Sequence, residues 1–216
     1  MNAARIAAVG LLMTGILVVV EVVARRTRMA PEASRKLAHA GGGTVVALLP
    51  AVMPLPEMAV LSALFVPFFL LSRRFDLLPS IHTAERSTLG EAYFPVGILI
   101  ATLVGRRALL VGCGILVMAL SDAAASLVGG RLGRHPFRLP TAPKTYEGSA
   151  AFFLVTATIL AVGLVATGLP AVTAVALALP LAGILTVAEA MLGWGLDNVV
   201  LPGLAAALMW LVTRSG

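Results

Sequence analysis

The sequence contains little charge and few aromatic residues. Only 12% of its 216 residues are charged and 6% are aromatic, whereas 59% are hydrophobic. Soluble domains carry about 25% charged residues, so this composition, with a mean hydropathy of +1.00, excludes an ordinary soluble domain. The single cysteine, Cys113, lies within an apolar run, which excludes a disulfide framework. The composition therefore predicts an integral membrane protein.

Several familiar motifs of nucleotide and metal sites are also missing. Neither lysine, Lys36 or Lys144, follows the glycines of a GxxxxGK[ST] phosphate loop, so a P-loop site is excluded. No cysteine-histidine cluster indicates zinc, and no GxSxG elbow indicates a serine hydrolase. A nucleotide or metal site would therefore have to be assembled from separate segments.

The apolar runs predict an all-α fold, a polytopic helical bundle that forms a single transmembrane domain over residues 1–216. A spanning helix needs about 20 apolar residues, so the length leaves room for roughly eight crossings. Interruptions by charge, proline or glycine place the predicted spans near residues 4–24, 37–54, 57–72, 92–105, 108–128, 149–168, 171–192 and 199–213. Four prolines inside these runs predict kinks or breaks, at Pro67, Pro95, Pro180 and Pro202.

The basic residues are unevenly divided between the two sides of this bundle. The richer side holds Arg25, Arg26, Arg28, Arg35, Lys36, Arg73, Arg74, Arg86, Arg131, Arg134, Arg138 and Lys144. The other side holds Arg5, Arg106, Arg107 and Arg214. By the positive-inside rule the richer side is cytoplasmic and both termini are outside. The absence of a transit-like segment favours a bacterial plasma membrane.

Most acids and histidines fall on the same side as the basic loops. They are His39, Asp76, His82, Glu85, Glu91, Asp122, His135, Glu147, Glu189 and Asp197. Membrane topology does not require this arrangement. It indicates a site for a water-soluble anionic partner, with the active site at the cytoplasmic face.

The stretch "SDAAASLVGG" ends an apolar run on an acid followed by small residues. On a helix, Asp122, Ala125, Ser126, Gly129 and Gly133 would share one face. Small residues spaced by four also mediate helix packing in membranes, and that alternative stays open for the glycines. An intramembrane carboxylate is costly and usually functional, and a metal ion that bridges phosphates would offset its cost.

The segment "PKTYEG" combines a cation, a hydroxyl and an acid. Lys144 would supply a point charge to a phosphate, Thr145 a donor and Glu147 a second carboxylate on the metal side. The alternative is a solvated loop that enters a helix, with Glu147 in the favourable first turn.

The segment "PEASRKLAH" predicts a helix start, after which Arg35, Lys36 and His39 share a face. We interpret the two cations as phosphate-binding. A cluster required only by topology, with a structural histidine, is the alternative.

Two further segments place acids at membrane entries. "ERSTLGEAYFP" contains Glu85, Arg86 and Glu91, and "EAMLGWGLDN" has Glu189 and Asp197 on either side of a glycine-rich break. Each could be a polar turn, but together they would bring several carboxylates near one metal-nucleotide site.

Taken in order, "SRKLAH", "ERSTLGEAYFP", "SDAAASLVGGRLG", "PKTYEGS" and "EAMLGWGLDNVVLP" resemble the polyprenol kinase family, which includes dolichol kinase, phytol kinase and the CTP-dependent diacylglycerol kinase of fungi. The resemblance extends from about Ser34 to Pro202. It implies phosphoryl transfer from CTP, with Mg²⁺ or another divalent metal, to the hydroxyl of a membrane lipid alcohol. The short N-terminus is similar to the phytol kinase type and argues against dolichol.

Carried over by position, the family's D-x-x-A-x-x-x-G-x-x-x-G pattern falls on Asp122, Ala125, Gly129 and Gly133. Its K-[ST]-x-E-G falls on Lys144, Thr145, Glu147 and Gly148, and its R-K-x-x-H on Arg35, Lys36 and His39. The resemblance thus links three separate segments to one site.

The expected site follows from these segments. The expected catalytic residues are Asp122, Lys144, Asp197 and His39, with the base left open between the last two. The expected phosphate-binding residues are Arg35, Lys36, Ser126, Gly129, Gly130, Gly133, Thr145 and Gly148. Asp122, Glu147 and Glu189 are the expected metal ligands, and Glu85, Arg86 and Glu91 complete the motifs.

Several acceptors and two other functions remain open at this point. Phytol, geranylgeraniol, another polyprenol or diacylglycerol could supply the hydroxyl, with its chain lying between helices. A phosphatidate cytidylyltransferase would also use CTP and metal, and a transporter would also carry intramembrane acids. No nucleic-acid partner is expected, and a homo-oligomer is left open.

Overall fold

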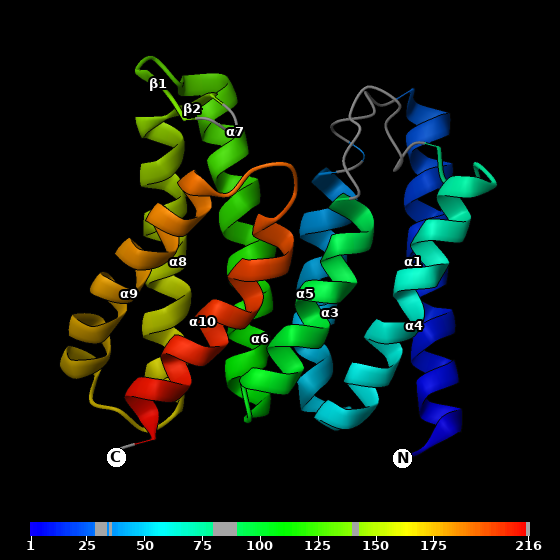
Figure 1. Ribbon diagram of the computed structural model, residues 1–216, viewed down its shortest axis with the longest axis horizontal. Coiled ribbons are helices and arrows are strands. Elements are labelled where there is room, and N and C mark those ends of the chain that lie inside the picture. Colours follow the sequence, from blue (N-terminus) through cyan, green and yellow to red (C-terminus); the bar gives the residue numbers. More distant parts are fainter. Residues whose placement is uncertain (29–33, 35, 80–89, 140–142, 215–216) are drawn as a thin grey trace.

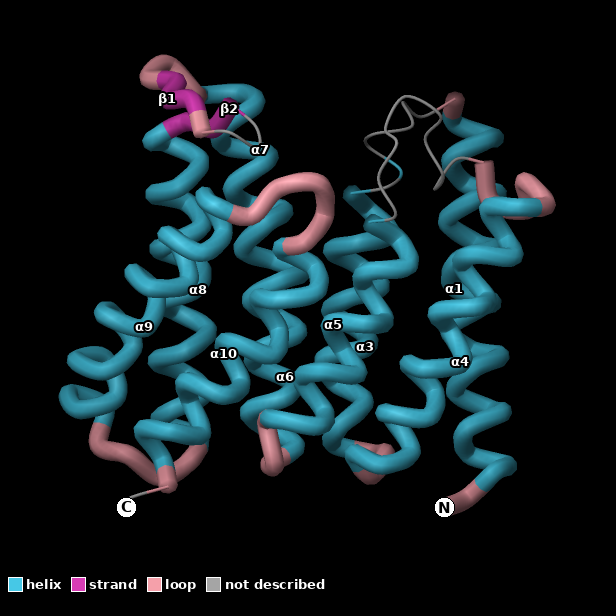
Figure 2. The backbone as a smooth tube through the Cα atoms, in the orientation of Figure 1, coloured by secondary structure: helices cyan, strands magenta, loops and turns pink. Residues whose placement is uncertain are grey.

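The computed structural model describes residues 1–28, 34, 36–79, 90–139 and 143–214. They form helices along almost their whole length (Figures 1 and 2), which confirms the predicted all-α class. The elements are α1 (Ala3–Thr27), η1 (Ala38–Gly42), α3 (Gly43–Leu48), η2 (Leu49–Ala51), α4 (Leu55–Arg74), α5 (Gly90–Val104), α6 (Ala108–Leu116), η3 (Val117–Ser121), α7 (Asp122–Leu132), β1 (Pro136–Arg138), β2 (Pro143–Thr145), α8 (Tyr146–Ala166), α9 (Ala171–Met191) and α10 (Asp197–Thr213).

Five helices are long and apolar enough to cross a membrane. They are Ala3–Thr27, Leu55–Arg74, Ala108–Leu132, Tyr146–Ala166 and Ala171–Met191, and the third joins α6, η3 and α7 into one rod. The helices α5 and α10 are apolar but shorter. The protein is therefore an integral membrane protein, and the count of eight crossings stays a prediction.

The prolines that predicted kinks or breaks lie inside continuous helices, so none of them marks a break. Pro67, Pro95, Pro180 and Pro202 belong to α4, α5, α9 and α10, respectively. A proline removes one backbone hydrogen bond, and in a membrane bundle the packing of neighbouring helices stabilises the rest of the helix.

Two apolar clusters flank the α6–η3–α7 rod. One joins the rod to α8, α9 and α10 around Phe152, Leu185 and Leu201. The other joins it to α1, α3, α4 and α5 around Met58 and Ile98. Because lipid tails are as apolar as these side chains, close packing rather than exclusion of water holds such helices together. The rod is thus the shared wall between the two halves of the bundle.

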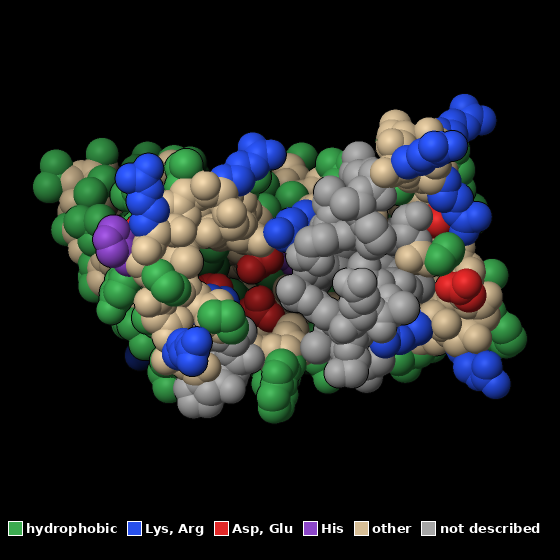
Figure 3. All heavy atoms as spheres, turned by 90° about the horizontal axis from the view of Figure 1, so that it is seen from above, with side chains coloured by type: hydrophobic (Ala, Val, Ile, Leu, Met, Phe, Trp, Pro, Cys, Tyr) green, Lys and Arg blue, Asp and Glu red, His purple; other side chains and the backbone are tan. Residues whose placement is uncertain are grey.

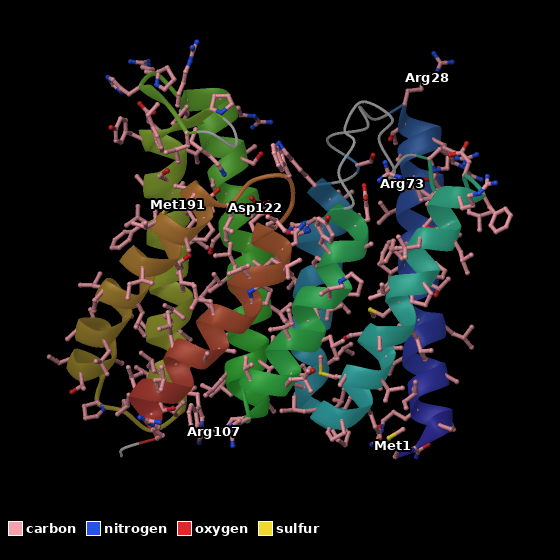
Figure 4. All side chains as sticks on the ribbon, viewed as in Figure 1. Met1, Arg28, Arg73, Arg107, Asp122 and Met191 are labelled. Atoms are coloured by element: carbon pink, nitrogen blue, oxygen red, sulfur yellow. The ribbon has the colours of Figure 1, made fainter. Side chains whose placement is uncertain are left out.

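The polar features concentrate at one end of this bundle. Both termini lie at the end opposite to the β1–β2 hairpin (Figure 1). Arg28 and Arg73 lie at the hairpin end, whereas Met1 and Arg107 lie at the terminal end (Figure 4). Arg28 and Arg73 of one predicted basic set therefore lie at the opposite end from Arg107 of the other, while the side that faces the cytoplasm stays a prediction.

Candidate active site

Two π-helices bring a histidine and an aspartate together in the middle of the hairpin end. His39 lies in η1, and Asp122 directly follows η3. The His39 Nε2 atom is 3.9 Å from Asp122 Oδ2 and 3.4 Å from the Met118 carbonyl oxygen. The Phe94 ring packs edge-on against the imidazole, with 5.1 Å between centroids. This histidine is therefore positioned on several sides.

Small residues allow the two π-helices to approach so closely. A Cβ atom on Gly43, directly after η1, would lie only 2.5 Å from the Ala119 Cβ in η3. A π-turn is rare and often occurs at functional sites. The distortion of both helices at one contact is consistent with such a site.

A second group of charged residues surrounds Asp122. Glu189, near the end of α9, is 2% exposed, and the Lys144 ammonium donates a hydrogen bond to its Oε1. Asp122 and Asp197 both lie close enough to interact electrostatically with Glu189. Asp197 also interacts with Asp122, Lys144 and His39. The structure therefore assembles residues from four sequence motifs into one cluster.

The cluster is open to the solvent side. Viewed onto the hairpin end, carboxylates lie in a hollow, and lysine and arginine side chains stand around it (Figure 3). Asp122 lies beside the loop that joins α9 to α10 (Figure 4). A water-soluble anion could enter along the basic rim.

The tight turn between α9 and α10 directs Glu189 and Asp197 to the same place. Trp194 and Gly195 adopt positive φ angles of 56° and 86°. A Cβ atom on Gly195 would lie 3.1 Å from the Gly90 Cα, so this turn packs directly on the start of α5. The Asn198 amide donates to the Gly90 carbonyl oxygen at 3.3 Å, which attaches the first turn of α10 to α5.

The hairpin supplies the lysine of the cluster. Lys144 lies on β2 and pairs in register with Phe137 of β1. At the end of β2 the Thr145 hydroxyl accepts a hydrogen bond from the Gly148 N–H at 3.1 Å and so caps α8. This hairpin is an addition to the predicted all-α fold.

Three of the predicted phosphate-binding glycines pack α7 against α8. A Cβ atom on Gly129 would lie 2.9 Å from the Thr145 Oγ1, and one on Gly133 would lie 2.7 Å from its Cγ2. A Cβ atom on Gly148 would lie 2.9 Å from the Ala125 carbonyl oxygen. This is the helix-packing role that the sequence left open. A Cβ atom on Gly130, in contrast, would meet nothing within 4 Å, and Ser126 is half-buried on α7.

Glu147 has a different partner from the one that the sequence suggested. Its Oε1 lies 2.6 Å from the His135 Nδ1, and its Oε2 accepts a hydrogen bond from the His135 backbone N–H at 3.3 Å. These bonds connect the hairpin to the first turn of α8. The contacts of Glu147 are those of a structural residue, and its metal-binding role stays a prediction.

The remaining predicted residues lie beside the cluster or outside the described part. Glu91, in the first turn of α5, forms an ion pair with Arg73 of α4 at 3.7 Å. Lys36 is half-buried just before η1. Arg35, Glu85 and Arg86 lie outside the described residues.

A divalent metal ion fits the chemistry of the cluster, although not as a closed protein cage. Within the described ranges no three His, Cys, Asp or Glu side chains are placed to ligate one ion. The buried Glu189 Oε2, however, has no hydrogen-bond partner among the described residues, and Asp122 and Asp197 lie nearby. Mg²⁺ is usually bound by one or two carboxylates together with substrate phosphates. Asp122 and Asp197 would suit that mode of binding.

Sequence reasoning missed the contribution of Asn198, Phe94 and Met118 to the site. None of them carries a local signal, because an amide, an aromatic ring and a backbone carbonyl gain their roles only from the close approach of distant helices. Small residues around Gly43 and Ala119 were the available hint.

Comparisons with known proteins agree with the motifs. The chain is 32% identical to the phytol kinase of Synechocystis sp. over 215 aligned residues, which cover 94% of this chain and 90% of that protein. No family model matches the chain, and no solved structure matches it. The identity and coverage of the match show that the chain belongs to the polyprenol kinase family, of which phytol kinase is a member.

Proposed function

We propose that the protein transfers the γ-phosphoryl group of CTP to the hydroxyl of a membrane isoprenoid alcohol such as phytol. The carrying observation is the cluster at the hairpin end, where Lys144 and Glu189 pair beside Asp122 and His39 lies 3.9 Å from that aspartate. Family membership supports a lipid-alcohol kinase, and the name of the Synechocystis relative supports phytol as an acceptor.

The charge of the cluster explains why the nucleotide would arrive with a metal ion. Asp122 and Asp197 interact with the Glu189 carboxylate, which accepts a hydrogen bond from Lys144, so carboxylates outnumber this cation. Phosphates alone would be repelled at such short range. Asp122 and Asp197 would hold Mg²⁺, which would neutralise charge on the phosphates.

Each residue of the cluster has a separate task in the proposed reaction. Lys144 contacts the transferring phosphoryl group, and Glu189 orients Lys144. His39 accepts the proton of the acceptor hydroxyl as the alcohol oxygen attacks the γ-phosphorus. The bond from that phosphorus to the bridging oxygen breaks, and the products are the lipid monophosphate and CDP. Phosphoryl transfer needs such positioning and charge neutralisation more than covalent help from the protein.

We assign the base to His39 rather than to Asp197. Only 16% of the His39 side chain is exposed, and His39 also lines the apolar cavity described below. It is therefore in contact with both the acidic cluster and a space that suits a lipid. Neutral imidazole is also a common general base.

We also infer the orientation of the protein in the membrane. The hairpin end would face the cytoplasm of a bacterial cell, where CTP is available, and residues 1–216 would act as one domain with both termini outside. Arg134, which is exposed at the hairpin end, offers a test. In a Cys113→Ser background, Arg134→Cys is expected to react with a membrane-impermeant maleimide only when the cytoplasmic face is accessible.

The position of the label in CTP tests the reaction. Purified protein in nanodiscs receives Mg²⁺, phytol, phosphatidic acid and CTP labelled at either the γ- or the α-phosphate, and the lipid extract is counted. We expect label only from the γ position, and less transfer from ATP, GTP or UTP. Label from the α position would instead indicate a cytidylyltransferase, and label from neither would contradict both enzymes.

Two variants and a matched control connect the activity to the cluster. Asp122→Asn and Lys144→Met are expected to abolish transfer. Asp76→Asn is the control, because Asp76 is an exposed acid after α4 at the same end and has a φ of 50° that asparagine tolerates. Equal loss of activity in all three variants would show that the cluster is not the site.

A further inference from the structure

An apolar cavity lies next to the acidic cluster, between α1, η1, α3, α4 and α5. Its volume is about 120 Å³, and most of its lining is apolar, with Met13, Ile16, Met58, Phe65 and Ile98 among the lining residues. Lining residues on α4 extend from Met58 to Phe69. At 1.5 Å per residue this is about 16 Å along the helix, roughly half of the 30 Å hydrocarbon core of a bilayer. The lining therefore extends over about half of the hydrocarbon core, whereas the volume of the cavity is small.

Polar groups of the lining gather where the cavity meets the cluster. His39, Glu91 and Asn198 line that end, because η1, α5 and α10 all begin near the hairpin end (Figure 1). The His39 ring contributes both to the cavity wall and to the contact with Asp122. A lipid whose chain lay in the cavity would place its polar end at His39.

One wall of the cavity is formed by a helix whose outer face is exposed. The helix α1 packs against α4 and η1, whereas its Leu11, Val19 and Val23 side chains are exposed. Three cavity-lining residues, Met13, Ile16 and Leu17, lie on this same helix. A hydrocarbon chain could enter sideways by displacement of α1, without crossing a polar barrier.

On the basis of the proposed function, we propose that this cavity holds the chain segment next to the hydroxyl of an isoprenoid alcohol and selects a single chain over the two chains of diacylglycerol. A cavity of about 150 Å³ lined by Leu, Ile and Phe accepts benzene, so about 120 Å³ suits one five-carbon branched unit. The cavity would therefore bind the first isoprenoid unit, and the rest of the chain would lie in the bilayer. Since an empty cavity destabilises a fold, an occupant from the membrane also explains why this space persists.

Two neighbouring glycines offer a matched pair of variants. Gly42 lines the cavity, and a Cβ atom there would meet nothing within 4 Å. A Cβ atom on Gly41 would also meet nothing within 4 Å, but Gly41 is exposed and outside the cavity lining. Gly42→Leu should therefore fill the cavity, whereas Gly41→Leu adds the same side chain to the same π-helix without filling it.

The kinetic test uses the full chain in nanodiscs. We expect Gly42→Leu to raise the KM for phytol about tenfold, which corresponds to about 1.4 kcal/mol, and to leave the KM for CTP unchanged. Gly41→Leu should leave both constants unchanged. Equal effects of the two substitutions on the KM for phytol would overturn the proposal.

A binding test separates this inference from the proposed reaction. A phytol analogue with a diazirine near its hydroxyl is cross-linked to the unmodified protein without nucleotide, and the labelled peptides are mapped. We expect labels in α1, α4 or η1, with competition by phytol and not by dioleoylglycerol. Such labels without γ-phosphoryl transfer would support phytol binding in the cavity and contradict the proposed reaction. Transfer with labels confined to α8 and α9 would support the proposed reaction and contradict phytol binding in the cavity.

Discussion

Replacing Lys144 with methionine is expected to destabilise the protein more than replacing Glu189 with glutamine. Glu189 is 2% exposed, whereas 24% of the Lys144 side chain is exposed. Without the ammonium, the Glu189 carboxylate keeps a buried charge beside Asp122 and Asp197, and breaking a buried pair in this way costs about 3–5 kcal/mol. With glutamine at position 189, the Lys144 ammonium can turn to water, so we expect a loss of about 1–2 kcal/mol.

Equilibrium unfolding in mixed micelles, followed by circular dichroism, would give the free energies of unfolding. The double variant Lys144→Met/Glu189→Gln should recover part of the loss of Lys144→Met, because it leaves no buried charge at position 189. A coupling of about 1–3 kcal/mol between the two sites is expected. Equal losses in the single variants that simply add in the double variant would refute the reasoning. Phosphoryl transfer should be lost in the double variant even where stability recovers, which separates the structural from the catalytic role of the lysine.

Three other expectations concern the neighbouring contacts. Gly148→Ala should lower the free energy of unfolding by about 1–3 kcal/mol through overpacking against α7. Gly130→Ala should not lower it, because a Cβ atom at position 130 meets nothing within 4 Å. Thermal unfolding of the two variants measures the difference, and equal losses would contradict the packing role of Gly148. Asp122→Asn should abolish transfer at every Mg²⁺ concentration, whereas Glu147→Gln should keep the wild-type Mg²⁺ dependence because Glu147 contacts His135; a higher Mg²⁺ requirement in the latter variant would restore Glu147 as a ligand. Thr156→Val removes the buried hydroxyl bond from α8 to η3 and should cost about 1 kcal/mol in the same unfolding assay, and no loss at all would show that this bond does not hold the π-helix.

The arrangement of helices followed closely from hydrophobic runs. The predicted spans at 57–72, 149–168 and 171–192 correspond to α4, α8 and α9, because a helix in lipid must be continuously apolar and the signal is local. The prolines were misleading as signs of breaks. Pro180 lies inside α9, where packing against α8 and α10 outweighs the missing hydrogen bond.

The membership of the charged cluster could be predicted only in part. Asp122, Lys144, Glu189 and Asp197 were selected from three separate motifs, and they do lie together. Their pairing could not be predicted, because it depends on how the hairpin places Lys144 beside the end of α9. Glu147 was predicted to be a metal ligand, but the hairpin places His135 within hydrogen-bond distance of it. This contact could not be predicted either, because it also depends on the hairpin.

The apolar cavity left no recognisable trace in the sequence. Its lining comes from α1, η1, α3, η2, α4, α5 and α10, and most of the lining residues resemble any other apolar residue of a membrane helix. A void is defined by what the side chains leave unfilled, which no periodicity records.

The facing π-helices make the site sensitive to chain length in a way that ordinary substitutions are not. Each π-turn accommodates one extra residue within a helix, and one residue corresponds to about 100° of rotation about an α-helix. A single-residue deletion within η3 would let the helix relax to regular α geometry and turn Asp122 away from His39, although every side chain of the site remained in the sequence. Among homologues, a one-residue gap in either segment should therefore mark loss of activity more reliably than many substitutions do, and single-residue insertions offer an evolutionary route by which an inert membrane helix could acquire an inward-facing acid.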